Sequence, residues 1–316
     1  MGTVTVPSTH LLARCALGAA LAVLVVCTQG CAGDQPTKPW HTAKLTEEFT
    51  AERIDAKVRS FEDYLALEER LFSQLDEQVF ANTPTGPEYA LVRFSRGSAA
   101  DPNRWPRNWN RTFELPADAP VGAVLLLHGM SDSPYSLRAL GQALNQQGYR
   151  VLGLRLPGHG TAPSGLKNVA WLDMAAAVRL AMQHLASQLE SEPIHIIGYS
   201  TGAPLALDFA LQAVAEGDRP VPASLVLVSP AIRVHAAGAL AGIKNALSTL
   251  PGLGGLAYLA IKDEFDPFNY NSFATNAGAQ VHAITRDVDR RIQALAQDPI
   301  LAEKLPPLSL IHISEP

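Results

Sequence analysis

The sequence predicts a three-layer α/β fold with a mostly parallel central sheet, and two observations support that prediction. Four short apolar segments expected to be strands lie at 121–129, 149–156, 193–200 and 223–230. Segments with helical patterning follow the first three of them, at about 133–147, 171–189 and 203–215. Strands that are continuously apolar are typical of a sheet covered by helices on both faces. Alternation of strand and helix indicates right-handed crossovers between parallel strands.

The composition fits a globular enzyme-sized domain and argues against a nucleic-acid partner. The chain has 316 residues, of which 47% are hydrophobic and only 17% are charged, with a formal net charge of −5. Chains that stay disordered are poor in apolar residues, and this one is not. A surface that binds phosphate backbones needs a basic field, and the sequence contains no block of Lys or Arg. We therefore expect a small-molecule substrate and no nucleic acid.

The N-terminus resembles an export signal that ends in a lipid-attachment motif. The apolar segment 15–27 follows Arg14 and is shorter than the roughly 20 residues that span a bilayer, so it fits a signal-peptide core. The sequence TQGC at 28–31 then resembles a bacterial lipobox with Cys31 as the lipidated residue, although Thr28 stands where that motif usually has Leu. A plain signal peptide, followed by free secretion, is the alternative.

This interpretation divides the N-terminal part of the chain and places the protein in the cell envelope. Residues 1–31 are expected to be the signal peptide and 32–44 a linker. The mature protein would be exported and held through Cys31 as a lipoprotein on the periplasmic side of a bacterial membrane. The cysteines Cys15, Cys27 and Cys31 all lie in this region, so the rest of the chain has no thiol for a disulfide, a metal or a nucleophile.

Three further segments complete the expected organisation. Residues 45–118 are expected to hold an amphipathic helix or helix pair at 45–80 and two extended stretches, 89–94 and 109–115, that pair antiparallel at a sheet edge. Residues 119–232 form the α/β core. Residues 233–305 break the strand–helix rhythm and are expected to be an inserted helical cap, with a helix at about 276–296.

The last nine residues, LSLIHISEP at 308–316, match a translation of the transposase adapter used in sequencing libraries. We expect this tail to be non-native. The natural protein would then continue beyond about Pro307, and the last strands of the sheet would be missing from this chain.

The strongest chemical signal is GYSTG at 198–202, a G-x-S-x-G motif between a predicted strand and a predicted helix. A sharp strand-to-helix turn exposes the hydroxyl of Ser200 at the positive end of the following helix. Gly198 and Gly202 are expected because larger side chains would collide with the neighbouring strand and helix. The alternative is a structural turn without chemistry.

A second motif, His128-Gly129-Met130, ends the first predicted parallel strand. Together, LLLHGMSDSPYS, GLRLPGHG and IIGYSTG resemble the serine hydrolases of the α/β-hydrolase fold, close to the monoacylglycerol lipase and carboxylesterase branch. The resemblance covers about residues 120–232. It implies that backbone N–H groups of Met130 and Thr201 form an oxyanion hole, and that His128 and Gly129 support the oxyanion loop rather than act as a base.

The acid and the base that would activate Ser200 are not identified. In the family the order is Ser, then Asp or Glu, then His. The histidines that follow the motif are His235, His282 and His312. The first comes too early, the second lies in a predicted helix and the third belongs to the suspect tail. Asp263 or Asp266 with His282 is a less favoured arrangement, and we expect both groups beyond residue 307.

These observations predict a serine hydrolase that cleaves carboxylic esters through an acyl-enzyme on Ser200, with a monoacylglycerol or a short-to-medium ester as substrate. A thioesterase or serine aminopeptidase of the same fold is an alternative within enzymes. A non-catalytic binding module of the cell envelope is the alternative outside them. The sequence shows no metal-ligand cluster and no dinucleotide-binding glycine motif, so no cofactor is expected. The 316-residue chain itself is expected to be essentially inactive.

Overall fold

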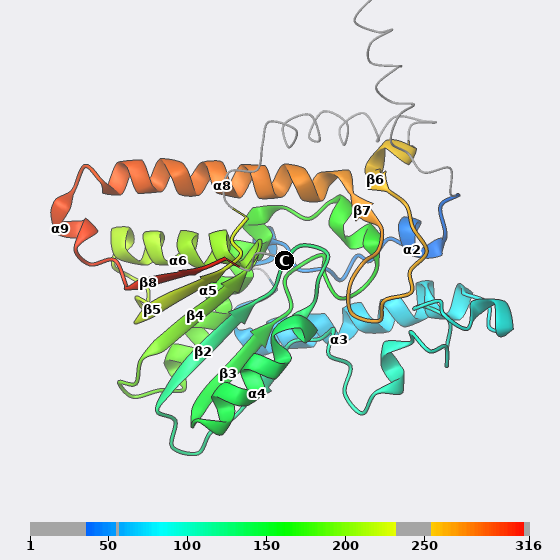
Figure 1. The fold of residues 1–316 in the computed structure, drawn as a ribbon, viewed down its shortest axis with the longest axis horizontal. Coiled ribbons are helices and arrows are strands. Elements are labelled where there is room, and N and C mark those ends of the chain that lie inside the picture. Colours follow the sequence, from blue (N-terminus) through cyan, green and yellow to red (C-terminus); the bar gives the residue numbers. More distant parts are fainter. Residues whose placement is uncertain (1–35, 55–56, 232–253, 313–316) are drawn as a thin grey trace, which may run out of the picture.

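The computed structural model describes residues 36–54, 57–231 and 254–312 (Figure 1). The signal-peptide and lipidation predictions, with all three cysteines, lie outside the described residues, as do residues 233–253 of the expected cap. Among the helices that the structure describes, none combines the length and apolar character needed to cross a bilayer.

The central sheet has six strands in the order β1-β3-β2-β4-β5-β8, and only β1 runs antiparallel to its neighbour. The strands are β1 Phe113–Leu115, β2 Gly122–Leu127, β3 Tyr149–Leu154, β4 Ile194–Tyr199, β5 Ser224–Val228 and β8 Leu308–Ile311. The four strands predicted from apolar runs therefore form β2 to β5, parallel and adjacent. The predicted three-layer, mostly parallel α/β fold is confirmed.

Helices cover both faces of this sheet (Figure 1). The α-helices of the described residues are α2 Pro39–Thr42, α3 Phe61–Gln78, α4 Arg138–Gln146, α5 Trp171–Ser187, α6 Gly202–Glu216, α8 Thr275–Leu295 and α9 Pro299–Ala302. On β2, Ala123, Leu125 and Leu127 belong to the core shared with α5, α6 and α8. The alternate residues Val124 and Leu126 pack on the other face, beside α4. The period of two along the strand thus divides the core into two layers.

The N-terminal region contributes one long helix and one short edge strand. Helix α3 begins at Ser60, whose hydroxyl accepts the N–H of Asp63 at 3.2 Å, and its buried stripe includes Tyr64 and Leu71. The segment before it is not the second helix that the pattern allowed. Residues 89–94, expected to pair with 109–115, form turns around the short 3₁₀ helix Pro87–Tyr89, and β1 pairs with β3 instead.

The expectation of an antiparallel pair was wrong because the backbone of residues 89–94 bonds elsewhere. The N–H of Arg93 donates to the carbonyl oxygen of Glu264 at 2.8 Å, and Pro87 fixes a turn at the start of the segment. A hydrogen-bond partner so far away in sequence cannot be predicted from the local pattern of residues. Residues 89–94 consequently join the N-terminal region to the segment around Glu264, in the C-terminal part of the cap region.

The cap region contains a two-stranded sheet, β6 Tyr258–Ala260 with β7 Phe273–Ala274, and the long helix α8. Helix α8 lies along α6 and is linked to it by Arg291 Nε, 3.0 Å from Asp208 Oδ1 (Figure 1). The helix predicted for the cap therefore packs in the helical layer of the core.

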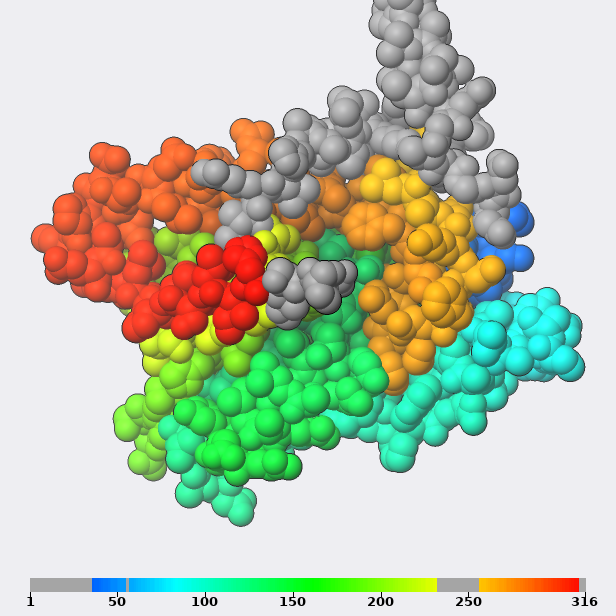
Figure 2. All heavy atoms as spheres, viewed as in Figure 1, coloured from blue at the N-terminus to red at the C-terminus, as the bar shows by residue number. Residues whose placement is uncertain are grey.

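A strand follows the cap region where the sequence predicted that the last strands are missing. Strand β8 pairs in parallel with β5 at the sheet edge, and Figure 2 shows it in red at the surface. Leu308, Leu310 and Ile311 are 49%, 53% and 47% exposed. Pairing of this segment does not depend on burial of its side chains, because all four of its residues are exposed.

Candidate active site

Ser200 lies on the turn between β4 and α6, with a left-handed backbone conformation of φ 51°. Its N–H donates to the carbonyl oxygen of Val228 at 2.9 Å, and its own carbonyl oxygen accepts the N–H of Ala231 at 3.1 Å. These bonds fasten the turn to the end of β5 and offset the strain of a non-glycine residue at positive φ. The side chain is half-buried at the N-terminus of a 15-residue helix, where the helix dipole favours negative charge.

Both glycines of the motif are required by close backbone contacts. A Cβ at Gly198 would lie 2.4 Å from the carbonyl oxygen of Gly202. A Cβ at Gly202 would lie 2.1 Å from the carbonyl oxygen of Leu127, at the end of β2. The turn therefore has no room for larger side chains, either within itself at Gly198 or against β2 at Gly202.

The loop after β2 lies directly against Ser200. A Cβ added to Gly129 would lie 3.2 Å from the Cβ of Ser200, so a larger residue there would push its neighbours apart by a few tenths of an ångström. Met130 is half-buried and Thr201 is buried. In the part of the chain that the structure describes, the N–H groups of Met130 and Thr201 take part in no turn, loop or cap hydrogen bond. Met130 and Thr201, the two residues expected to form the oxyanion hole, thus lie on the two segments that meet at Ser200.

His128 is fully committed to supporting this loop. Its Nε2 accepts the N–H of Leu156 at 3.1 Å, so its Nδ1 carries the proton and donates to the carbonyl oxygen of Gly129 at 2.9 Å. Burial lowers the pKa of His128 well below its usual value, with smaller contributions from His159 and Arg155. A neutral imidazole with both nitrogens engaged fits the loop-supporting role and not that of a general base.

The next loop, which supplies Leu156, is held by a buried charge cluster that the sequence analysis missed. The guanidinium of Arg155 is 1% exposed, and its Nε lies 3.0 Å from Glu68 Oε2 and its Nη2 2.9 Å from Glu48 Oε1. Glu48 also accepts the N–H of Gly158 at 2.9 Å. The N-terminal region therefore fixes the loop that fixes His128. Local patterning gives no signal for these pairs, because they join residues about a hundred positions apart.

The acidic aromatic segment 263–273 is hydrogen-bonded to the loop after β2. This loop, which carries Met130 and Ser131, is the oxyanion loop. The Ser131 hydroxyl donates to Asn269 Oδ1 at 3.0 Å, and the N–H of Tyr270 donates to the carbonyl oxygen of Ser131 at 2.7 Å. Ser131 has φ 63°, so this loop, like the serine turn, is strained and bonded in place. Arg93 in turn donates to the carbonyl oxygen of Asn269 at 3.2 Å.

Asp132 brings a buried carboxyl group close to the same loop. It is 9% exposed and its Oδ1 accepts the N–H of Ser133 at 2.8 Å. Burial, and to a smaller extent the charge of Asp266, raise its pKa from 3.8 to about 6 against the opposing effect of a hydrogen bond with Ser136. This perturbed group was not predicted from the sequence.

A family model described as serine aminopeptidase, S33, matches residues 118–313, more than half of the chain. The chain belongs to this family. The match includes the serine turn, the oxyanion loop and β8, and it agrees with the observed α/β-hydrolase sheet.

Individual relatives match over shorter stretches. A magnesium-chelatase 30 kDa subunit of Rhodobacter capsulatus is 36% identical over 127 residues, 40% of this chain and 40% of that protein. A thermostable monoacylglycerol lipase of Bacillus sp. (strain H-257) is 36% identical over 93 residues, 29% of this chain and 36% of that protein. The chain thus matches about two fifths or less of the length of these curated relatives.

Solved structures of lipolytic enzymes are also similar. A metagenome-derived lipolytic enzyme superposes with a TM-score of 0.48 and 18% identity, over 65% of this chain and 88% of its own. A monoglyceride lipase from Saccharomyces cerevisiae superposes with a TM-score of 0.45 and 14% identity, over 64% of this chain and 82% of its own.

The family's acid and base do not appear beside Ser200 in the described residues. His282 lies on α8 with a buried Nδ1 that has no partner there, and His312 is exposed after β8. Neither forms a hydrogen bond with Ser200 Oγ. His235 lies outside the described residues. Asp266 Oδ1 accepts the N–H groups of Phe268 and Asn269, so that carboxylate organises its own turn.

Proposed function

We propose that this protein hydrolyses carboxylic esters through an acyl-enzyme on Ser200. The observation that carries the proposal is the meeting of three features: a serine at φ 51° on a strand-to-helix turn, Gly129 against its Cβ, and two N–H groups beside it without described partners. A turn with a purely structural role has no need for a second strained loop packed against the serine. The non-catalytic binding module is therefore the weaker alternative.

In the proposed reaction, Ser200 Oγ attacks the ester carbonyl carbon and its proton passes to a base. The electron pair of the C=O bond moves to oxygen, and this oxyanion accepts N–H bonds from Met130 and Thr201. Collapse of the intermediate breaks the bond to the alcohol, which takes the proton. Water then attacks the acyl-enzyme by the same sequence and releases the carboxylic acid.

The substrate proposal rests on the family and on the relatives. Similarity to a monoacylglycerol lipase over 93 residues favours a monoacylglycerol or a short-to-medium acyl ester. The description of the family as serine aminopeptidases supports a second candidate, the removal of an N-terminal residue from a peptide. Parallel assays with p-nitrophenyl esters and aminoacyl p-nitroanilides distinguish the two.

The base and the acid are the parts of this proposal that the described residues do not supply. We propose that both belong to natural sequence that would replace residues 308–316, and that the 316-residue chain turns over p-nitrophenyl esters negligibly. Sequencing the gene past codon 307 tests this directly. Rapid turnover by the 316-residue chain would contradict it and would direct the search to His235 or His282.

A fluorophosphonate probe tests the nucleophile without requiring turnover. We expect the folded protein with its acid and base complete to be labelled at the peptide containing Ser200, and Ser200→Ala to abolish labelling. Ser187→Ala, which changes an α5 serine outside the site, is the matched control and should label normally. Labelling that persists in Ser200→Ala, or that occurs equally in denatured protein, would refute the assignment. With a complete acid and base, Ser200→Ala should lower kcat by several orders of magnitude.

A further inference from the structure

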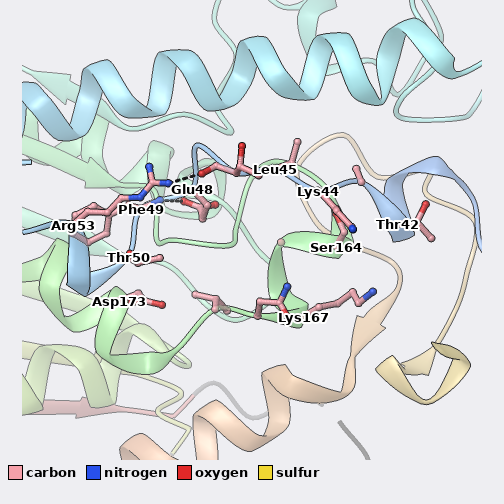
Figure 3. A pocket seen from close by; sticks show the side chains of 15 residues that line it. Thr42, Lys44, Leu45, Glu48, Phe49, Thr50, Arg53, Ser164, Lys167 and Asp173 are labelled. Carbon is pink, nitrogen blue, oxygen red and sulfur yellow. Dashed lines mark hydrogen bonds between the residues drawn. The ribbon is translucent and has the colours of Figure 1, made fainter. Parts of the chain in front are cut away.

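A cavity of about 420 Å³ lies between the N-terminal segment 42–53 and the 3₁₀ helix η6, Pro163–Lys167 (Figure 3). Its volume falls in the range of small-molecule sites. None of its lining residues belongs to the serine turn or the oxyanion loop. In Figure 3, Glu48, Arg53 and Asp173 lie at one end of the cavity, and Lys44, Lys167 and Ser164 lie at the other.

The carboxylates at the acidic end of the cavity already accept hydrogen bonds from groups of the protein itself. Glu48 bonds the buried Arg155 and the N–H of Gly158. Asp173 accepts the N–H of Ala51 at 2.8 Å through one oxygen and that of Ala170 at 2.8 Å through the other. These carboxylates therefore neutralise structural donors and are not available to the cations across the cavity.

The cations at the other end have no such partners. Among the described residues, Lys44 and Lys167 form no ion pair, whereas Arg53 donates to the carbonyl oxygen of Thr46 at 2.5 Å. Both lysines line the cavity, with Lys44 exposed and Lys167 half-buried. Partial burial, and then the charge of Lys44, lower the pKa of Lys167. The two cations thus line one cavity without an ion-pair partner among the described residues.

Ser164 provides a second, independent observation at the same end. The residue lines the cavity and is 7% exposed, and its Oγ has no hydrogen-bond partner among the described residues. A buried hydroxyl without a partner costs free energy unless another group bonds it. A ligand in the cavity would supply that partner with a small shift of the surrounding side chains.

We propose that this cavity binds a phosphate group through the ammonium groups of Lys44 and Lys167 and the hydroxyl of Ser164. A phosphate monoester carries nearly two negative charges and three acceptor oxygens, which matches two cations and one hydroxyl donor. A carboxylate would leave one lysine uncompensated. The room beside the lysines admits the group to which the phosphate is attached, either a soluble molecule or a lipid headgroup.

The first test is a titration of the full chain with inorganic phosphate at constant ionic strength, with chloride as the reference anion. Saturable binding is expected. Lys44→Gln and Lys167→Gln should each weaken it by about tenfold, the loss of one charge-assisted hydrogen bond. Lys304→Gln, at an exposed lysine remote from the cavity, is the control and should leave the affinity unchanged. Absence of saturable binding, or equal weakening by all three variants, would overturn the proposal.

Ser164→Ala separates a ligand contact from a structural role. Because the hydroxyl has no described partner, its removal should not lower the melting temperature in phosphate-free buffer. It should nevertheless weaken phosphate binding several-fold. A loss of stability with unchanged phosphate affinity would remove Ser164 from the site.

Vesicles distinguish the two sources of the phosphate. Wild type and the double variant Lys44→Gln/Lys167→Gln are compared on phosphatidylcholine vesicles with and without phosphatidic acid, whose headgroup is a phosphate monoester. Both proteins share the same N-terminus, so any anchor contributes equally. Loss of the preference for phosphatidic acid in the double variant assigns the cavity to a lipid headgroup. An equal preference, together with lysine-dependent binding of inorganic phosphate, assigns it to a soluble phosphate ester. These measurements need no turnover, so they stand or fall separately from the proposed esterase activity.

Discussion

Ser200, the proposed nucleophile, has a backbone conformation that few residues other than glycine adopt. Ser200 at φ 51° and Ser131 at φ 63° lie on the two segments that meet at the candidate site, and each is fixed by backbone hydrogen bonds to a distant segment. Left-handed residues cost of the order of 1–2 kcal/mol each. The bonds to Val228, Ala231 and Tyr270 offset that cost, so the site is positioned by its surroundings and not by local preference.

The oxyanion-hole assignment predicts a difference between two neighbouring substitutions. Because the donors are backbone N–H groups, Met130→Leu should change the rate of fluorophosphonate labelling by less than about threefold. Thr201→Pro removes a donor and should lower that rate by about 100-fold. Circular dichroism checks that both variants are folded. If Met130→Leu were as damaging as Ser200→Ala, the side chain of Met130 would have a role beyond that of its backbone.

Asp132 predicts a specific pH dependence of stability. Its folded pKa of about 6 exceeds the unfolded value of 3.8, so the folded state binds the proton more tightly. The resulting stabilisation is fully present below about pH 4 and is lost as the pH rises through 6. Asp132→Asn should therefore be more stable than wild type at pH 7, by of the order of 2–3 kcal/mol.

Urea denaturation at pH 4 and pH 7 measures this difference. The advantage of Asp132→Asn should shrink toward pH 4, where wild type is itself protonated. Buried His159, whose pKa burial lowers to about 4, pulls the stability of both proteins the other way, so the comparison between them isolates Asp132. An advantage that is the same at both pH values would contradict the shift.

At the level of elements, the serine turn and β2 are locked by backbone contact. Gly202→Ala would place a Cβ 2.1 Å from the Leu127 carbonyl oxygen, so it should destabilise by about 3 kcal/mol or more. Gly217, at the end of α6, has φ 72° and open space around it, so Gly217→Ala should cost only about 1 kcal/mol. Urea denaturation of the two variants compares steric contact with backbone strain alone, and equal losses would show that the contact relaxes.

Two adjacent residues of α3, Glu68 and Glu69, allow a matched comparison, because only Glu68 bonds the loop after β3. Glu68 is buried against Arg155, whereas Glu69 bonds Arg111 at the surface with 69% of its side chain exposed. Removal of one partner of a buried pair costs about 3–5 kcal/mol, against less than about 1 kcal/mol for an exposed pair. Glu68→Ala should therefore destabilise severely and Glu69→Ala hardly at all, as measured by thermal unfolding.

These elements also show what can be predicted from the sequence. The strands β2 to β5 and the helices between them follow from local patterning and appear within a few residues of the predicted bounds. The glycines of the serine turn could be anticipated because their constraint is local. The turns of residues 89–94 and the cluster around Arg155 could not, because their hydrogen bonds and ion pairs join segments that only the fold brings together.

For the whole molecule, the N-terminal sequence predicts attachment to a membrane. If Cys31 is lipidated, palmitate labelling and sedimentation with membranes should both depend on it, and Cys31→Ala should abolish them. Cys27→Ala, within the same segment, is the control and should retain both. Release of an unmodified wild-type product would leave only the plain signal peptide.

The buried charge cluster of Arg155, Glu48 and Glu68 also bears on the order in which the chain folds. Glu48 and Glu68 precede Arg155 by 107 and 87 residues. During synthesis both carboxylates emerge long before their cation, and each must wait for a large loop to close. The N-terminal region is therefore not expected to dock early, even though α3 has an N-terminal cap. We expect its docking to be a late step, and the same step would complete the loop under His128. The last contacts to form on the N-terminal side would thus be those that shape the oxyanion hole, so reactivity toward a serine probe would report the end of folding.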